Sequence, residues 1–155
     1  MSNNDILRTL RYTFHFHDHK MAEIFGFGGV KLFAEEVALW LKKEDDPEFK
    51  KLYDKDLAAF LNGFIILNRG LKGEEVPVPE KSLNNNLILR KLRIALNYKD
   101  EDMLEIFDLR GFRLSKHELS AFFRKPTQAQ YRECKDQVLR NFLMGLQMKY
   151  RPKED

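Results

Sequence analysis

Residues 3–11 read NNDILRTLR and residues 85–93 read NNLILRKLR, so the same nine-residue pattern returns after a shift of 82 positions. The same shift places residues 21–25, MAEIF, on residues 103–107, MLEIF, and no gap is needed between them. About a third of the roughly 67 aligned positions are identical, which chance does not produce without gaps. The chain is therefore a tandem duplication of one unit.

The two copies span residues 3–69 and 85–151, and residues 70–84 lie between them. This segment contains two glycines and two prolines, which prevent a continuous helix, so we expect an extended linker. At about 3.3 Å per residue, residues 70–82 of the linker can reach roughly 40 Å. That reach allows the copies to pack side by side or across from one another.

The spacing of the apolar residues predicts four helices in each copy. Residues 57–64 show the i, i+3, i+4, i+7 spacing of a packed helix face. Matched polar residues are expected to cap the first, second and fourth helices of the two copies, namely Asn4 and Asn86, Asp18 and Asp100, Asp54 and Asp136. We therefore predict an all-α protein of two tandem, similar four-helix units packed about a pseudo-twofold axis.

One doubled series of motifs is specific. It runs Asn-Asn-x-Ile-Leu-Arg-x-Leu-Arg, then Met-x-Glu-Ile, then Trp/Phe-Leu/Phe-Lys/Arg-Lys, then Phe-Leu-x-Gly. This series resembles the bacterial YehS-like family, a family of domains of unknown function, and the likeness covers nearly the whole chain outside the linker and the tail. The resemblance implies a bacterial, cytosolic, all-helical protein. It supplies no activity and no catalytic residues.

The composition excludes several protein classes. With 43% hydrophobic and 33% charged residues, it is typical of a globular protein rather than a disordered one. No window approaches the roughly 18 apolar residues of a membrane span. The N-terminus lacks the basic segment and apolar run of a secretory signal, and a single cysteine cannot form a disulfide within the chain. We expect a cytoplasmic protein with no membrane contact.

Charge is divided unevenly between the copies. Residues 3–69 contain 10 Lys/Arg against 11 Asp/Glu, whereas residues 85–151 contain 14 against 8. A basic copy of this kind could neutralise several phosphates of RNA or DNA, and a solvated basic surface is the alternative. The candidate nucleic-acid-binding residues are Arg90, Lys91, Arg93, Lys99, Arg110, Arg113, Arg124, Lys125 and Arg140.

Gly63 and Gly145 occupy matching positions inside the predicted fourth helices. Glycine in a helix interior costs about 1 kcal/mol relative to alanine, so its presence in both copies indicates that something approaches closely. We expect the two fourth helices to cross at these glycines, which makes them candidate inter-repeat packing residues.

We expect no enzyme activity, no cofactor and no metal site. The sequence contains no Gly-rich phosphate loop, nucleophile elbow or His-Glu-x-x-His motif. Residues 15–19, HFHDH, gather three histidines and an acid, but alternating residues at a helix end do not converge on a metal, and we expect a solvated loop. Cys134 matches Leu52 of the first copy, which favours a small buried apolar residue over a nucleophile.

Two functions from different classes are consistent with these observations. The first is a non-catalytic helical binding module for protein–protein interaction or regulation, with another protein or a second copy of itself as partner. The alternative is sequence-independent binding of RNA or DNA backbone by the basic second copy. Phosphate binding weakens steeply as salt rises, whereas an apolar groove does not respond in this way.

Overall fold

The computed structural model describes residues 1–73 and 75–151, and these residues form eight α-helices and no strand. The prediction of an all-α fold is confirmed. The first copy contains α1 (Asn3–Thr13), α2 (Asp18–Phe27), α3 (Ala34–Leu41) and α4 (Asp54–Arg69). The second contains α5 (Asn85–Leu96), α6 (Asp100–Leu109), α7 (Lys116–Ala121) and α8 (Asp136–Tyr150). None of the described helices is long and apolar enough to cross a membrane.

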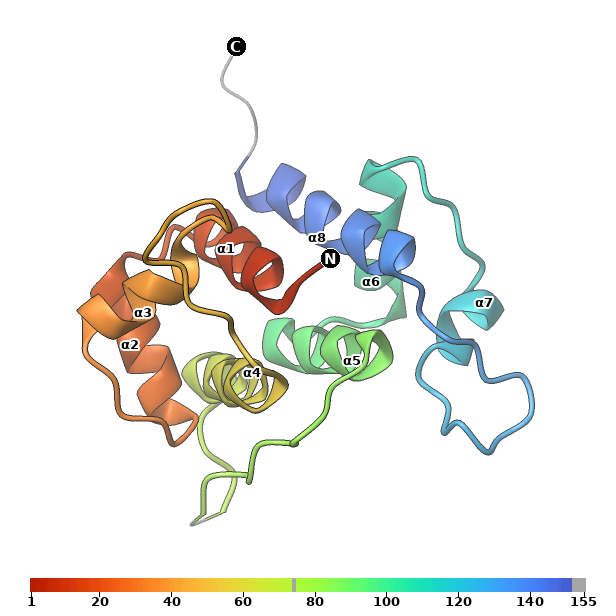
Figure 1. Cartoon of the computed structure of the whole chain (residues 1–155). Helices are drawn as coiled ribbons and strands as arrows, with labels where there is room; N and C mark the ends of the chain where they lie inside the picture. Colours follow the sequence, from red (N-terminus) through yellow and green to blue (C-terminus); the bar gives the residue numbers. More distant parts are fainter. Residues whose placement is uncertain (74, 152–155) are drawn as a thin grey trace.

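The two copies meet along two pairs of helices. Figure 1 shows α4 beside α5 and α1 beside α8, with the remaining helices of each copy on the outside. The shift of 82 positions converts α4 into α8 and α5 into α1, so the two pairs are equivalent. We call them the α4–α5 seam and the α8–α1 seam. The predicted pseudo-twofold arrangement is confirmed.

The helices of the α4–α5 seam are parallel. At their starts, the backbone N–H of Leu83 donates to the carboxylate of Asp54 at 2.9 Å. At their ends, the guanidinium of Arg69 donates to the carbonyl oxygen of Ile94 at 3.3 Å. The first contact joins the start of α4 to a residue just before α5, and the second joins the end of α4 to the last turn of α5.

The α8–α1 seam repeats these contacts. The amino group of Met1 donates to the carboxylate of Asp136 at 3.4 Å, and the guanidinium of Arg151 donates to the carbonyl oxygen of Tyr12 at 3.1 Å. All four residues lie 82 positions from a partner in the other seam. The arginine that ends the fourth helix of each copy therefore holds the last turn of the first helix of the other copy.

Parallel helices require the linker to return along α4, whose 16 residues are about 24 Å long. Residue 74 of the predicted linker, 70–84, lies outside the described residues. The linker residue Glu80 pairs with Lys91 of α5 at 3.0 Å. A pocket of about 270 Å³ is lined by residues of α4, α5 and the linker, including Pro77. The linker thus passes along the α4–α5 seam.

The first helix of each copy does not begin as predicted. Asn4 and Asn86 are not caps. The caps are Ser2 and Asn84, two residues earlier, whose side chains each accept a hydrogen bond from the amide three residues further on.

Asn4 and Asn86 are buried and fasten the segment that precedes the fourth helix. Asn4 Nδ2 donates to the carbonyl oxygens of Trp40 and Lys50, both at 2.9 Å, and Oδ1 accepts from the amide of Leu52 at 3.0 Å. Asn86 forms the same three bonds at the matching positions of the second copy. Burying a side-chain amide is favourable only when its hydrogen bonds are satisfied. Each asparagine therefore fixes the backbone conformation of the segment before the fourth helix.

The predicted aspartate caps are the first residues inside their helices, and the preceding residue is the cap in each case. Their carboxylates still face the positive end of the helix dipole. The four residues are Asp18, Asp54, Asp100 and Asp136.

Gly63 and Gly145 pack against the second helix of their own copy, so the prediction that the fourth helices cross there is wrong. A Cβ on Gly63 would lie 1.8 Å from the carbonyl oxygen of Ile24 in α2, and one on Gly145 would lie 2.3 Å from that of Ile106 in α6. Successive helix residues differ by about 100° in direction. The residue before Gly63, Asn62, faces the seam, and the glycine therefore faces its own copy.

The α2–α4 contact is closer than its counterpart because it has a second glycine. A Cβ on Gly28, which ends α2, would lie 1.9 Å from the carbonyl oxygen of Ala59 in α4. The matching residue of the second copy is Arg110. Two backbones therefore touch at two points in the first copy and at one in the second.

A single apolar core runs through both copies. Its centre repeats as well: Phe25 and Phe60 lie with ring centroids 5.2 Å apart, and Phe107 and Phe142 lie 5.3 Å apart. All four rings are fully buried. The copies are thus halves of one packed unit rather than independent bodies.

Candidate binding surfaces

Lys91 does not lie on a surface that a phosphate can reach, so its prediction as a nucleic-acid contact is wrong. Its side chain is 9% exposed and pairs with Glu80 at 3.0 Å. Its Nζ also donates to Asn62 Oδ1 at 2.6 Å. An ammonium group tolerates burial only when it is paired, and here α4 and the linker supply its partners. Lys91 is a residue of the α4–α5 seam.

Other basic side chains of the second copy are scattered or already engaged. Arg93 pairs with Asp100 at 2.7 Å and lies 4.8 Å above the ring of Phe123. The guanidinium of Arg113 lies 3.8 Å from the carboxylate of Asp108. The remaining three in this group are exposed and form no ion pair with the described residues: Lys99, Arg110 and Arg140.

Three of the nine predicted residues, Arg90, Arg124 and Lys125, are brought together around one pocket at the start of α5. We call it the α5 pocket. It has a volume of about 220 Å³, and the rest of its lining consists of Asn84, Asn86, Leu87, Phe122, Pro126 and Tyr131. No carboxylate among the described residues forms an ion pair with the three cations, so the α5 pocket is positively charged.

A second pocket lies where α1, α4, α5 and α8 all end, and residues at or next to the ends of all four helices line it. We call it the axial pocket. Its volume is about 680 Å³. Four aromatic rings form much of its wall: the centroid of Phe14 lies 5.2 Å from that of Phe64 and 5.0 Å from that of Tyr150, and Phe16 lies 5.9 Å from Phe64.

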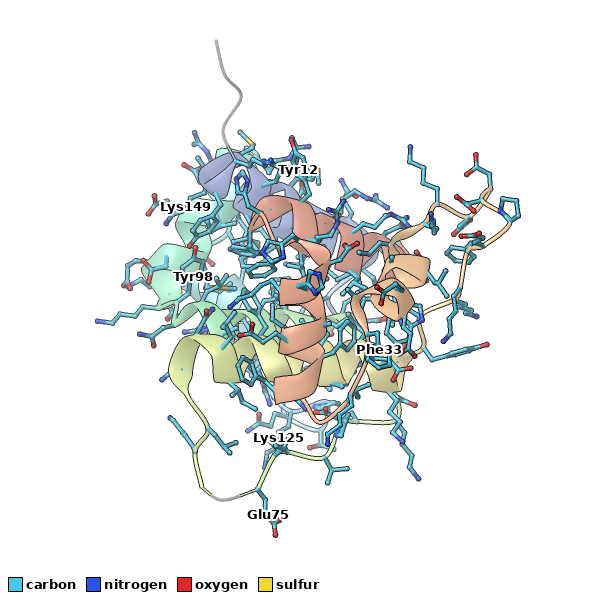
Figure 2. The ribbon with its side chains drawn as sticks, turned by 90° about the vertical axis from the view of Figure 1, so that its left-hand side faces the viewer. Tyr12, Phe33, Glu75, Tyr98, Lys125 and Lys149 are labelled. Atoms are coloured by element: carbon cyan, nitrogen blue, oxygen red, sulfur yellow. The ribbon has the colours of Figure 1, made fainter. Side chains whose placement is uncertain are left out.

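The rim of the axial pocket is polar and carries positive charge. Arg69 and Lys72 line it together with two asparagines. Beside it, the hydroxyl groups of Tyr98 and Tyr150 lie 2.5 Å apart, and Lys149 Nζ lies 5.4 Å above the ring of Tyr98. Figure 2 shows Tyr98 and Lys149 on the same side of the molecule, well above Lys125 of the α5 pocket. The two pockets are separate sites.

Burial, reinforced by the hydrogen bond with Tyr150, holds the pKa of Tyr98 well above its ordinary value. This phenol therefore stays protonated and acts as a hydrogen-bonding group of the rim.

Cys134 and His17 occupy structural positions. Burial raises the pKa of the Cys134 thiol to about 12, and its side chain is 2% exposed. The ring of His17 accepts a hydrogen bond from the amide of Lys20 at 3.3 Å and caps α2. Among residues 1–73 and 75–151, no three His, Cys, Asp or Glu side chains are grouped as ligands for one metal ion.

Sequence reasoning missed the axial pocket. Phe14 and Phe64 fall on apolar helix stripes, and such a stripe does not distinguish a buried core position from one that lines a pocket. One signal was available: the apolar stripes of the first and fourth segments continue to the very ends of these segments in both copies.

Comparison with known proteins places the chain in a family. A family model described as "Protein of unknown function (DUF1456)" matches residues 3–70 and 85–151. The chain belongs to the DUF1456 family. Its two matched segments are the two copies, which confirms the resemblance drawn from the doubled motifs.

One DUF1456 relative is the Escherichia coli (strain K12) protein named "Uncharacterized protein YehS", which is 44% identical over 148 residues. The alignment covers 94% of each chain. No solved structure matches. Neither the family description nor the name of this relative states an activity or a partner.

Proposed function

We propose that the protein is a non-catalytic binding module whose axial pocket receives an apolar segment of a partner protein. The observation that carries this proposal is the wall of aromatic rings around about 680 Å³ where the four helices end. Exposed aromatic area extends around this end of the molecule: Tyr150 of the pocket wall is 37% exposed, and Tyr12 outside the pocket is 46% exposed. Exposed apolar area with a polar rim is typical of a protein-binding surface.

The groups that line the axial pocket suit recognition. They are aromatic and aliphatic side chains, amides, a phenol and two cations, and no carboxylate, imidazole or thiol is among them. Such a lining offers burial and hydrogen bonds without a nucleophile or a group that titrates near neutral pH. Arg69 and Lys72 favour a segment with carboxylates beside its apolar side chains.

The alternative, binding of RNA or DNA backbone, is less well supported. It needs many cations on one face. Lys91 is buried in the α4–α5 seam and Arg93 is paired with Asp100, so neither is free to contact a phosphate. The three cations that do gather surround one pocket of about 220 Å³, the α5 pocket, rather than a groove along which a strand could lie.

Site-specific photo-crosslinking in cells tests the proposal. A benzophenone amino acid is placed at Lys72, which is exposed and lines the axial pocket, and in a matched variant at Lys55, which is exposed at the opposite end of α4. We expect a crosslinked protein with Lys72 replaced and none with Lys55 replaced, and peptide mapping should find an apolar segment with carboxylates. Adding Leu67→Glu to the Lys72 variant should abolish the product, because a carboxylate in the pocket repels that segment.

Several results would overturn the proposal. A product that forms equally well from both positions would show that the axial pocket is not selective. A product consisting of two copies of this chain would assign the pocket to self-association, and a product containing nucleic acid would favour the backbone-binding alternative.

A further inference from the structure

At the start of α1, the carboxylate of Asp5 is fully engaged by groups of its own copy. Asp5 Oδ2 accepts from the backbone N–H of Ser2 at 3.0 Å, and Asp5 Oδ1 pairs with the guanidinium of Arg8. The same guanidinium donates to the carbonyl oxygen of Lys42 at 2.8 Å. One carboxylate thus neutralises the arginine and satisfies the amide that precedes the helix.

The start of α5 keeps the donors and lacks the carboxylate. Asn84 stands in place of Ser2, Arg90 in place of Arg8, and Leu87 in place of Asp5. Arg90 still donates to a carbonyl oxygen at the end of the third helix, that of Phe123, at 2.7 Å. Among the described residues, no carboxylate pairs with Arg90, and the backbone N–H of Asn84 forms no hydrogen bond. Both groups belong to residues that line the α5 pocket.

The loop that faces these groups differs between the copies in the same direction. Residues 42–48, KKEDDPE, have two cations and four carboxylates, whereas residues 124–130, RKPTQAQ, keep both cations and have no carboxylate. The loop is also fixed: Arg124 donates to the carbonyl oxygen of Ala129 at 3.1 Å, and the amide of Lys125 donates to the side chain of Gln128 at 2.7 Å. Five acids at matching positions are therefore replaced while the basic residues stay.

From these observations we infer that the α5 pocket binds the phosphate group of a small phosphorylated molecule, whose oxygens bind the counterparts of the groups that the Asp5 carboxylate binds in the first copy. The phosphate accepts hydrogen bonds from the Arg90 guanidinium and the Asn84 amide, both at the positive end of α5. Arg124 and Lys125 neutralise its second charge. Pro126, Tyr131 and Leu87 line the same pocket and offer an apolar wall for the rest of the ligand.

A phosphate monoester fits better than the phosphodiester of a nucleic-acid backbone. Three cations around about 220 Å³ match the double charge that a monoester carries near neutral pH, whereas each backbone phosphate carries one. This site is independent of the axial pocket, because the two pockets share no lining residue.

The comparison between the copies supplies a sharp variant. Leu87→Asp should place in the α5 pocket the carboxylate that Asp5 places at the start of α1, and so should fill the site from within. This variant keeps the fold, because an aspartate three residues after the cap is favourable. Leu87→Asn is the matched control of nearly equal size and no charge, and Asp5→Asn is a control in the other copy.

The measurement is isothermal titration with inorganic phosphate, phenyl phosphate as a monoester, dimethyl phosphate as a diester and a short RNA. We expect saturable binding of phenyl phosphate, at least tenfold tighter than dimethyl phosphate. Leu87→Asp and Arg90→Ala should each weaken it by about tenfold to a hundredfold, the usual range for loss of a charge-assisted contact, while both asparagine variants should bind within about twofold of the parent.

Thermal unfolding of each variant establishes that it is folded. The inference fails if neither phosphate nor phenyl phosphate binds saturably, or if Leu87→Asp binds as tightly as Leu87→Asn. Binding of RNA alone, lost with Arg90→Ala, would also overturn it and would return the α5 pocket to the backbone-binding alternative.

Discussion

The two seams between the copies join equivalent pairs of helices, but different side chains fill them. In the α4–α5 seam, the ammonium group of Lys91 is buried against Asn62 at 2.6 Å and pairs with Glu80 at 3.0 Å. The equivalent positions of the α8–α1 seam hold Thr9 and Met144. The hydroxyl of Thr9 donates to a carbonyl of its own helix at 2.8 Å, so no charge is enclosed there.

The linker explains this difference. It passes along the α4–α5 seam and contributes Glu80, the counter-ion that makes a buried lysine tolerable. No described segment passes along the α8–α1 seam in the same way. The two copies thus differ in sequence where their surroundings differ. The starts of α1 and α5 differ as well: the first copy has the Asp5 carboxylate there, and the second has the cationic α5 pocket.

The two copies also differ in the contact between their second and fourth helices, and substitutions there should have the largest effect on stability. Gly63→Ala should lower the free energy of unfolding by about 3 kcal/mol and Gly145→Ala by about 2 kcal/mol, because each methyl group would overlap a backbone carbonyl and the first overlap is the closer. Urea unfolding of the purified variants gives both values.

Gly26→Ala is the control, since nothing lies within 4 Å of the added methyl group and α2 continues through this position. We expect it to be neutral or to stabilise the protein by up to about 1 kcal/mol. A Gly63→Ala variant as stable as the parent would contradict the backbone contact.

Removing the buried polar groups from the α4–α5 seam should make it apolar. Asn62→Ala should cost about 2 kcal/mol, because the buried ammonium of Lys91 loses an acceptor. Replacing Asn62 and Lys91 together by methionine, with Glu80→Gln to remove the counter-ion, should recover most of this loss, since an apolar seam is as stable as a paired charge when both charged groups are removed.

A double-mutant cycle of Asn62→Met and Lys91→Met in the Glu80→Gln background, followed by urea unfolding, measures the coupling. We expect the variant with all three changes within about 1 kcal/mol of the parent. If the losses of the single variants simply add, the two side chains act independently and the seam does not depend on their pairing.

Much of the fold could be predicted from the sequence, because apolar spacing and the 82-residue register are local and repeated. The role of Asn4 could not, because an asparagine near a helix start reads as a cap, and its true partners lie about 40 residues away in sequence. Lys91 reads as a surface cation for the same reason: Asn62 and Glu80 become its neighbours only after folding.

The candidate sites were also hard to predict, because their residues come together only in the folded chain. Three of the nine basic residues share a pocket, and the axial pocket is assembled from the ends of four helices that are far apart in the chain. The replacement of Asp5 by Leu87 was visible in the aligned copies, but it gains meaning only once Arg90 is seen without a carboxylate.

The smallest expected effect concerns acid stability. Burial raises the pKa of Asp5, but the hydrogen bonds from Ser2 and the charge of Arg8 outweigh this effect and hold it below its usual value of 3.8. A carboxyl with a lowered pKa stabilises the fold above its unfolded pKa, and this contribution is lost as pH falls through the lower folded value. The difference in stability between pH 6 and pH 3 should therefore shrink in Asp5→Asn and grow in Leu87→Asp, which adds a matching acid beside Arg90. Both changes should stay below about 1 kcal/mol because these side chains are partly exposed. Urea unfolding at the two pH values measures them, and an Asp5→Asn variant whose acid sensitivity equals that of the parent would show that this carboxylate is not coupled to folding.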